Sequence, residues 1–263
     1  MILQEVFWAA SDFGWVVGHS YIVYAPLLHG CSTIIYEGKP VGTPDPGAFW
    51  RVCQQYKVAC LFTAPTVLRT LKKEDPEAKY MAKYPLPSMR ALFLAGERSD
   101  SDSLKWAARH LKIPVIDHWW MTETGWPITG QCLGLGARDV KIGAAGRPIP
   151  GFEVHVLDDQ GRRVPASAFG NIVVKLPMPP GTLPTLWKND ERYVSSYLKR
   201  FPGYFDTGDA GLVDSGSFVQ VMSRTDDLIN VSESFSSGQS VHAEAITPPD
   251  KLGGRTPFID GNR

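Results

Sequence analysis

The first half of the chain alternates short apolar runs with longer stretches whose apolar positions follow a helical period. The apolar runs predict strands at 32–36, 59–62, 91–94 and 113–116. The periodic stretches predict helices at 48–56, 65–71 and 103–110. Strands that alternate with helices favour βαβ units, so we expect an α/β fold with a mostly parallel sheet over residues 1–142.

The pattern changes after Gly143, where a loop rich in glycine and proline fills 143–151. Strands are predicted at 153–157 and 171–176, with a turn at 158–161 after the first of them. Short strands separated by such turns are typical of antiparallel sheets, so we expect a small β subdomain over 143–225. The last stretch, 233–263, is rich in polar residues, glycine and proline, and we expect a disordered tail there.

The longest apolar stretch, 15–28, contains His19, Ser20 and Pro26 and is shorter than the roughly 20 residues of a membrane helix. We expect it to be a core segment. The 27 basic residues balance 27 acidic ones, which gives no overall electrostatic argument for binding nucleic acid or an anionic membrane. The four cysteines form no CxxC pair and no targeting signal is recognisable, so a reduced intracellular chain is the simplest interpretation.

The segment 117–125 is the most informative about function, because a tryptophan pair, a hydroxyl and a carboxylate directly follow a predicted strand. Its residues are Asp117, His118, Trp119, Trp120, Met121, Thr122, Glu123, Thr124 and Gly125. In an open α/β sheet, ligands bind beyond the carboxyl ends of the strands, so the segment predicts one wall of a nucleotide site. The alternative is a core tryptophan pair followed by a solvated turn.

Two smaller clusters suggest the same chemistry, and each has an ordinary structural alternative. Gly96 and Glu97 follow a predicted strand, where glycine lets a flat ligand approach the backbone or simply makes a turn. The segment 204–211 places Asp206 and Asp209 in a predicted turn. A carboxylate there can accept hydrogen bonds from ribose hydroxyls or from its own backbone.

A third cluster centres on Arg224, which is followed by paired acids and an apolar run. Its guanidinium could hydrogen-bond ribose oxygens, or it could form a surface ion pair with Asp226 or Asp227. Each cluster is weak alone. Their joint presence and their order along the chain carry the argument.

In this order, the clusters resemble the AMP-forming acyl-CoA synthetases of the adenylating superfamily, above all the short-chain acetyl-CoA and propionyl-CoA branch with its mitochondrial members. The resemblance runs from about residue 6 to Ser232 and includes the segments 15–21, 63–66 and 95–97. It implies the C-terminal half of an adenylation large domain. It also implies that ATP, with Mg²⁺, converts a carboxylate into an acyl-adenylate and pyrophosphate, and that the thiol of CoA then displaces AMP.

The resemblance also assigns roles to individual residues. The nucleotide would be surrounded by Gly96, Glu97, Arg98, Asp117, His118, Trp119, Trp120, Met121 and Thr122, with its ribose on Asp209 and Arg224. Thr122 would contact the α-phosphate, and Glu123 would hold Mg²⁺ against the triphosphate. Asp226 would be a catalytic hinge residue in a hinge at 226–232, and Ser232 would lie near CoA.

By the same resemblance, the acyl pocket would be lined by Val16, Val17, Ala95 and Trp120. The indole of Trp120 would close the floor of the pocket and restrict it to short acids. Ala95 stands where acetate-specific relatives carry valine, which frees space for one or two more carbons. We therefore expect propionate to be favoured over acetate.

The chain departs from the family pattern at several points. The phosphate-binding loop that precedes the first strand in relatives, and the C-terminal domain with its catalytic lysine, are not in this sequence. We therefore expect a truncated chain that forms little or no acyl-CoA alone. Met121 replaces a glutamine, Val17 replaces a threonine, and Arg98 replaces a proline of acetate-specific relatives.

Two other interpretations stay open. The chain could be a non-catalytic nucleotide-binding or interaction fragment, or it could belong to another adenylating class, such as an amino-acid-activating domain. The resemblance favours the mitochondrial matrix as the location, with the cytosol as the alternative. Neither nucleic acid nor a membrane span is expected, and the oligomeric state is not predicted.

Overall fold

The computed structural model describes residues 3–39, 41, 44–137 and 139–225. Met1–Leu228 form one compact unit and Ile229–Arg263 a second one, which lies outside the described residues. The predicted hinge at 226–232 and the predicted tail at 233–263 therefore also lie outside them. The rest of this section concerns the first unit.

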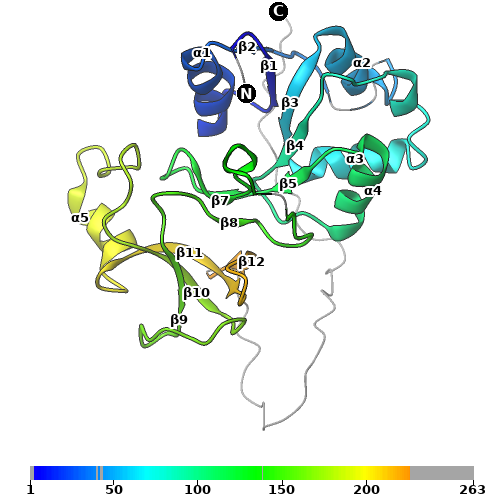
Figure 1. The fold of residues 1–263 in the computed structure, drawn as a ribbon. Helices are drawn as coiled ribbons and strands as arrows, with labels where there is room; N and C mark the ends of the chain where they lie inside the picture. Colours follow the sequence, from blue (N-terminus) through cyan, green and yellow to red (C-terminus); the bar gives the residue numbers. More distant parts are fainter. Residues whose placement is uncertain (1–2, 40, 42–43, 138, 226–263) are drawn as a thin grey trace, which may run out of the picture. The chain divides into compact units, whose positions relative to one another are not determined.

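A five-stranded parallel sheet forms the first part of this unit, as the alternating pattern predicts (Figure 1). Its spatial order is β2 (Ser32–Thr33), β1 (Val6–Ala10), β3 (Val58–Thr63), β4 (Ala91–Leu94) and β5 (Val115–Asp117). All six residues of β3 are buried, as expected for a central strand of a parallel sheet. The prediction of a strand at 32–36 is too long, because Ile34 and Tyr36 pack against the core without pairing with β1.

Three helices cover one face of the parallel sheet: α2 (Ala48–Gln55), α3 (Pro65–Glu74) and α4 (Ser101–Leu111). Their apolar sides share a core with Trp8 and Leu92 of the sheet. Pro65 occupies the first turn of α3, where its missing amide costs no hydrogen bond. Asp100 caps α4, because its Oδ1 accepts a hydrogen bond of 2.8 Å from the amide of Ser103.

The opposite face is partly covered by the π-helical turn η1 (Gly18–Tyr24) and by α1 (Ala25–Leu28). Within the apolar stretch 15–28, Tyr21 is buried, whereas Trp15 and Leu28 are 69% and 87% exposed. The prediction of a core segment is therefore wrong for its outer side, because a helix buries only the stripe that faces its neighbours. Among the described residues, no helix is long and apolar enough to span a membrane.

Antiparallel sheets follow the parallel one. The first has the order β6 (Trp119–Trp120), β7 (Pro127–Gly130), β8 (Arg147–Pro148), and the second has the order β12 (Val219–Arg224), β11 (Tyr204–Val213), β10 (Gly170–Lys175), β9 (Val154–Leu157). Short helical segments are η2 (Met81–Lys83), η3 (Leu133–Leu135), α5 (Asp190–Tyr193) and η4 (Val194–Leu198). This arrangement confirms the predicted α/β class with an antiparallel β part.

Two sequence predictions in this part need correction. The predicted loop at 143–151 contains β8. The predicted turn at 204–211 is wrong, because these residues form most of β11. The pairing register of β11 with β10 shifts between Asp206 and Asp209, so Thr207 and Gly208 form a bulge in the strand. The bulge explains how turn-forming residues fit inside a strand.

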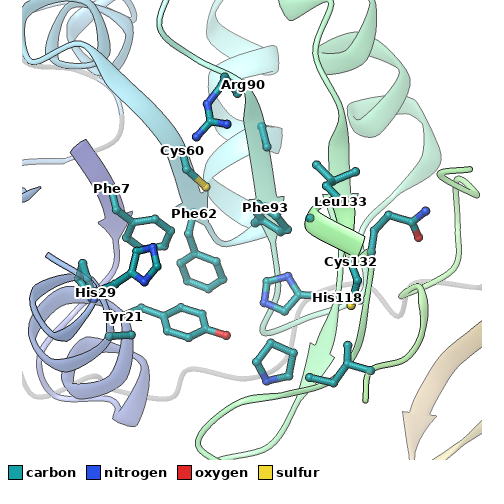
Figure 2. Close-up of a pocket in the computed structure, with 18 of the residues that line it drawn as sticks. Phe7, Tyr21, His29, Cys60, Phe62, Arg90, Phe93, His118, Cys132 and Leu133 are labelled. Atoms are coloured by element: carbon teal, nitrogen blue, oxygen red, sulfur yellow. The ribbon is translucent and has the colours of Figure 1, made fainter. Parts of the chain in front are cut away.

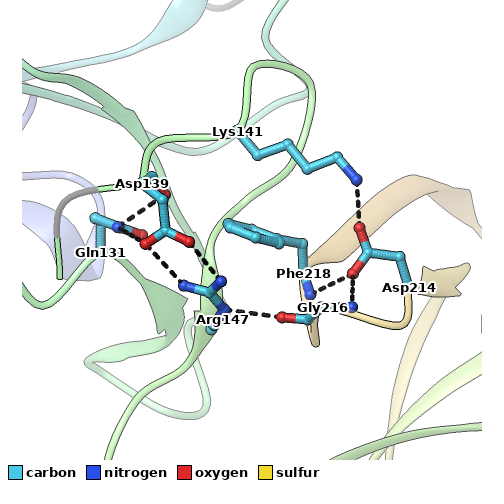
Figure 3. A network of polar contacts seen from close by, with 7 residues as sticks. All are labelled: Gln131, Asp139, Lys141, Arg147, Asp214, Gly216 and Phe218. Atoms are coloured by element: carbon cyan, nitrogen blue, oxygen red, sulfur yellow. Dashed lines mark hydrogen bonds and ion pairs between the residues drawn. The ribbon is translucent and has the colours of Figure 1, made fainter.

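Polar contacts join the loop before β8 to the hairpin between β11 and β12 (Figure 3). Arg147 pairs with Asp139 and donates a hydrogen bond of 2.8 Å to the carbonyl oxygen of Gly216. Its guanidinium also lies 4.0 Å from the ring centroid of Phe218. In addition, the amide of Val219 donates to the carbonyl oxygen of Gly146 at 2.9 Å.

The close packing at Gly146 gives a stability prediction. Gly146 has φ +82, and a Cβ there would lie 2.4 Å from the carbonyl oxygen of Gly130. Gly136 has a similar φ of +86 but open space around a Cβ. Both alanine variants carry the left-handed backbone cost of about 1–2 kcal/mol. We expect Gly146→Ala to lose clearly more stability than Gly136→Ala in urea unfolding, and equal losses would contradict the packing.

Candidate functional site

A cavity of about 480 Å³ lies where β4, β5 and β6 end and where β11 and β12 meet them; we call it the strand-end cavity. Every described residue that the resemblance places near the nucleotide or its metal ion lines it: Gly96, Glu97, Arg98, Asp117, His118, Trp119, Trp120, Met121, Thr122, Glu123, Asp209 and Arg224. The cavity is also lined by six residues to which the sequence assigned no binding role: Ser99, Gly143, Ala145, Val221, Met222 and Ser223. The predicted residues Asp226 and Ser232 lie outside the described residues.

The turn after β6 is fixed by the buried hydroxyl of Thr124. This hydroxyl accepts a hydrogen bond of 3.2 Å from the amide of Met121 and lies 2.8 Å from the carbonyl oxygen of Trp126, to which it can donate. The chain between these anchors turns sharply, so Thr122 is exposed and Glu123 is half-buried at the cavity. The sequence thus builds a short rigid turn that presents a hydroxyl and a carboxylate side by side.

Asp209 and Arg224 line the cavity together. The indole Nε1 of Trp119 donates a hydrogen bond of 2.9 Å to Oδ2 of Asp209. Nη1 of Arg224 lies 3.6 Å from Oδ1 of the same carboxylate and donates to the carbonyl oxygen of Thr207. The predicted ion pair of Arg224 with Asp226 or Asp227 concerns residues outside the described ones, and the described partner is Asp209.

Trp119 is both a core residue and a cavity residue, so the two interpretations of the tryptophan pair apply together. It is 8% exposed and packs in the core of the antiparallel sheet, with Ile128 and Phe205 among its neighbours. Trp120 instead stacks on Tyr21 with ring centroids 5.6 Å apart and planes at 13°. The pair therefore points into two different environments, as expected for successive residues of a strand.

The residues predicted to line the acyl pocket gather mostly in one cluster. Val17 and Ala95 are buried together with Tyr21 and Phe62, and Trp120 packs against this cluster. Val16 is half-buried and is not part of the cluster. The structure therefore brings three of the four predicted residues together.

A second cavity, of about 1120 Å³, lies on the face of the parallel sheet opposite α2, α3 and α4. Figure 2 shows Phe7, Phe62 and Phe93, from three neighbouring strands, lining it beside Tyr21 and His118. We call it the aromatic cavity. The signal that could have revealed it is the aromatic residue that each of β1, β3 and β4 places on this face.

His118 lines both cavities. Its ring lies 5.5 Å from that of Phe62 and 5.8 Å from that of Phe93, and burial lowers its pKa to about 4. The imidazole is therefore neutral near pH 7. Asp117 responds to burial in the opposite way: loss of solvent raises its pKa to about 7, although hydrogen bonds from Ser99 and from the amide of His118 oppose the rise.

The donor set near Glu123 fits Mg²⁺ bound together with a phosphate ligand. Among the described residues, no group of three or more His, Cys, Asp or Glu side chains could hold a metal ion by itself. Mg²⁺ is usually held by one or two carboxylates plus substrate phosphates and water, and one carboxylate beside the exposed Thr122 hydroxyl suits that mode.

Comparison with known proteins decides the family. Residues 2–181 match the family described as AMP-binding enzyme. The chain belongs to this family. It is 54% identical over 228 residues to acyl-CoA synthetase short-chain family member 3, mitochondrial, of Bos taurus, covering 86% of this chain and 33% of that protein. It is 44% identical over 229 residues to propionate–CoA ligase of Escherichia coli, covering 86% of this chain and 36% of that protein.

The fold agrees with this family. The crystal structure of the anthranilate CoA ligase AuaEII in complex with anthranoyl-AMP matches with a TM-score of 0.73 at 20% identity, covering 88% of this chain and 42% of that one. The chain spans about a third of the length of the two relatives named above. The predicted resemblance to an AMP-forming synthetase is thereby confirmed at the level of family and fold.

The buried carboxyl of Asp117 should make stability depend on pH. Its folded-state pKa of about 7 exceeds the unfolded value of about 3.9, so its contribution is complete below about pH 4 and is lost as the pH rises through 7. As the pH rises from about 5 to about 8, we expect the free energy of unfolding of Asp117→Asn to fall less than that of the wild type, as measured by urea unfolding. Asp102→Asn, on the exposed side of α4, is the control; an unchanged pH profile for Asp117→Asn would contradict the assignment.

Proposed function

We propose that this chain is part of an AMP-forming acyl-CoA synthetase that binds ATP in the strand-end cavity and activates a short-chain carboxylate as its acyl-adenylate, before transfer to CoA. The observation that carries the proposal is the convergence of four separate segments on one cavity. These segments supply Gly96 to Arg98, 117–123, Asp209 and Arg224. Relatives named acyl-CoA synthetase and propionate–CoA ligase support the same reaction class.

The nucleotide is expected to lie with its adenine beside Gly96. This glycine has φ +104 and no atom within 4 Å of the position of a Cβ, so a flat ring can approach the backbone. The ribose hydroxyls would then face Asp209 and Arg224, a carboxylate and a planar cation that match paired hydroxyls. In this orientation the phosphates extend toward Thr122 and Glu123.

The chemistry needs charge stabilisation more than a protein nucleophile. A carboxylate oxygen attacks the α-phosphorus of ATP, and pyrophosphate leaves, which turns a poor electrophile into a reactive anhydride. When bound, Mg²⁺ would neutralise charge on the phosphates. The chain's own residues would position the reactants. Thr122 would donate a hydrogen bond to the α-phosphate, and Glu123 would bind the cation. Asp226 as the hinge and Ser232 near CoA are part of the same proposal.

Propionate is the acid we propose, over acetate. The pocket would lie beside Val16 and Val17, with Ala95 as one wall and the indole of Trp120 as its floor. Stacking on Tyr21 fixes the orientation of that indole, so the side chain cannot easily move aside to accommodate a longer acid. The small side chain of Ala95 leaves room for an additional methylene.

The Bos taurus relative, which is named as mitochondrial, suggests the matrix as the location, with the cytosol as the alternative. A tagged chain expressed in its native cell and followed by fractionation distinguishes the two compartments. Location does not alter the chemistry proposed for the cavity.

The ribose assignment predicts discrimination between nucleotides. The chain should bind AMP more tightly than 2′,3′-dideoxy-AMP. Arg224→Ala should weaken AMP binding roughly tenfold or more, since a hydrogen bond to a charged group contributes about 1.5–3 kcal/mol. The variant should also bind AMP and 2′,3′-dideoxy-AMP equally well. Isothermal titration calorimetry measures this, with Asp209→Asn as a second variant and the exposed Arg109→Ala as the control. Absence of AMP binding by the wild type would refute the nucleotide site.

The acyl assignment predicts a preference among alkyl esters of AMP, which are stable analogues of the acyl-adenylate. The propyl ester should bind about fourfold more tightly than the ethyl ester, because one buried methylene contributes about 0.8 kcal/mol. Ala95→Val should remove that preference and leave the affinity for AMP itself unchanged. Equal binding of both esters by the wild type would contradict the proposed preference for propionate.

A further inference from the structure

Tyr197 in η4 contacts the strand-end cavity from outside it. Its hydroxyl donates a hydrogen bond of 2.6 Å to Oε1 of Glu123, which lies 74 positions earlier in the chain. Tyr197 itself does not line the cavity. Its hydrogen bond to Glu123 is therefore a direct link from Tyr197 to the cavity.

The ring of Tyr197 is held on a rigid support. It stacks on Phe205 with ring centroids 5.0 Å apart and planes at 5°, and Phe205 is a core residue of β11 that is 1% exposed. The ring of Tyr193 also lies 5.5 Å from it, tilted by 47°. These two aromatic contacts hold the ring of Tyr197, and with it the hydroxyl, in place.

The backbone of Glu123 is fixed by the same part of the chain. The amide of Leu183 donates a hydrogen bond of 2.7 Å to the carbonyl oxygen of Glu123. The hydroxyl of Tyr193 in turn donates to the carbonyl oxygen of Leu183 at 3.1 Å. Glu123 is therefore held at its backbone and at one carboxylate oxygen by residues 183–197.

The hydrogen bond has a defined direction. A tyrosine hydroxyl carries its proton at neutral pH and an ionised carboxylate can only accept, so Tyr197 is the donor. Within the described part of the chain, the second oxygen of Glu123, Oε2, has no hydrogen bond or ion pair. One oxygen is thus oriented by the protein, and the other can bind a cation.

We propose that Tyr197 is a positioning residue whose hydroxyl orients the carboxylate of Glu123 so that Oε2 meets the Mg²⁺ that accompanies ATP. This inference rests on the proposed function. It follows the general pattern in which groups outside the ligand shell hydrogen-bond a metal-binding carboxylate and tune its affinity.

The test uses Tyr197→Phe, which keeps the stacked ring and removes only the hydroxyl. ATP is titrated calorimetrically into the purified chain, once with Mg²⁺ and once with a chelator. Mg²⁺ should increase the affinity of Tyr197→Phe for ATP about tenfold less than it increases that of the wild type, which is the size of comparable effects from residues outside the ligand shell. Metal-free ATP should bind to both equally. Tyr204→Phe, whose hydroxyl contacts Arg163 and does not line the cavity, is the matched control.

Glu123→Gln separates positioning from general support. It should abolish most of the Mg²⁺-dependent gain, and adding Tyr197→Phe to it should cause no further loss, because the hydroxyl then has no carboxylate to orient. Circular dichroism checks that each variant is folded. If Tyr197→Phe does not fold, 4-fluorophenylalanine, which also lacks a hydroxyl donor, replaces tyrosine at position 197. It should lose the Mg²⁺-dependent gain to the same extent, and an undiminished gain would overturn the positioning role.

The outcomes are distinguishable. If Mg²⁺ increases the ATP affinity of the wild type and of Tyr197→Phe equally, the positioning role is overturned and the proposed function stands. Equal weakening of ATP binding with and without Mg²⁺ also overturns it, since the hydroxyl then supports only the local structure. A wild-type chain that does not bind ATP under either condition overturns the proposed function, and the positioning role with it.

Discussion

The hydrogen bond between Trp119 and Asp209 is the contact on which the site depends, because it joins β6, directly after the parallel sheet, to β11 of the four-stranded antiparallel sheet. Both residues are buried, and a buried carboxylate is stable only when it is paired or hydrogen-bonded. Asp209 therefore cannot leave Trp119 without a large cost. Because β6 and β11 are fixed to each other here, the strand-end cavity between them has a defined width, and the residues on its two walls can contact one ligand.

The bulge in β11 is what directs Asp209 toward the cavity. Its extra residues break the ladder with β10, and Thr207 replaces the lost pairing: its hydroxyl lies 2.6 Å from the carbonyl oxygen of Ile172, to which it can donate, and accepts from the amide of Asp209. Gly208 has φ +67, and a Cβ there would lie 2.9 Å from the guanidinium of Arg224. The positive φ favours glycine at this position, and a Cβ would also require the end of the Arg224 side chain to shift.

The sequence predicted what depends on local pattern and missed what depends on distant contacts. The central strands follow from continuous apolar runs, and the site residues follow from motifs at strand ends and from the family resemblance. The strand β11 was mistaken for a turn, because Asp206, Gly208 and Asp209 favour turns until a neighbouring strand supplies the pairing. Tyr197 gave no signal, because the hydrogen bond that matters for the cavity is to Glu123, a residue 74 positions away.

The charges around the strand-end cavity show why Glu123 is the residue to expect beside a cation. Four carboxylates of the described residues line the cavity. Glu97 lies 3.8 Å from Arg69, Asp209 lies 3.6 Å from Arg224, and burial raises the pKa of Asp117 to about 7. Glu123 differs from these three, since among the described residues its side chain meets a neutral hydroxyl and no cationic group within 4.0 Å. Among the described residues, Glu123 is thus the carboxylate of this cavity whose charge is least compensated, and a cation brought by a polyphosphate would compensate it where Tyr197 holds it in place.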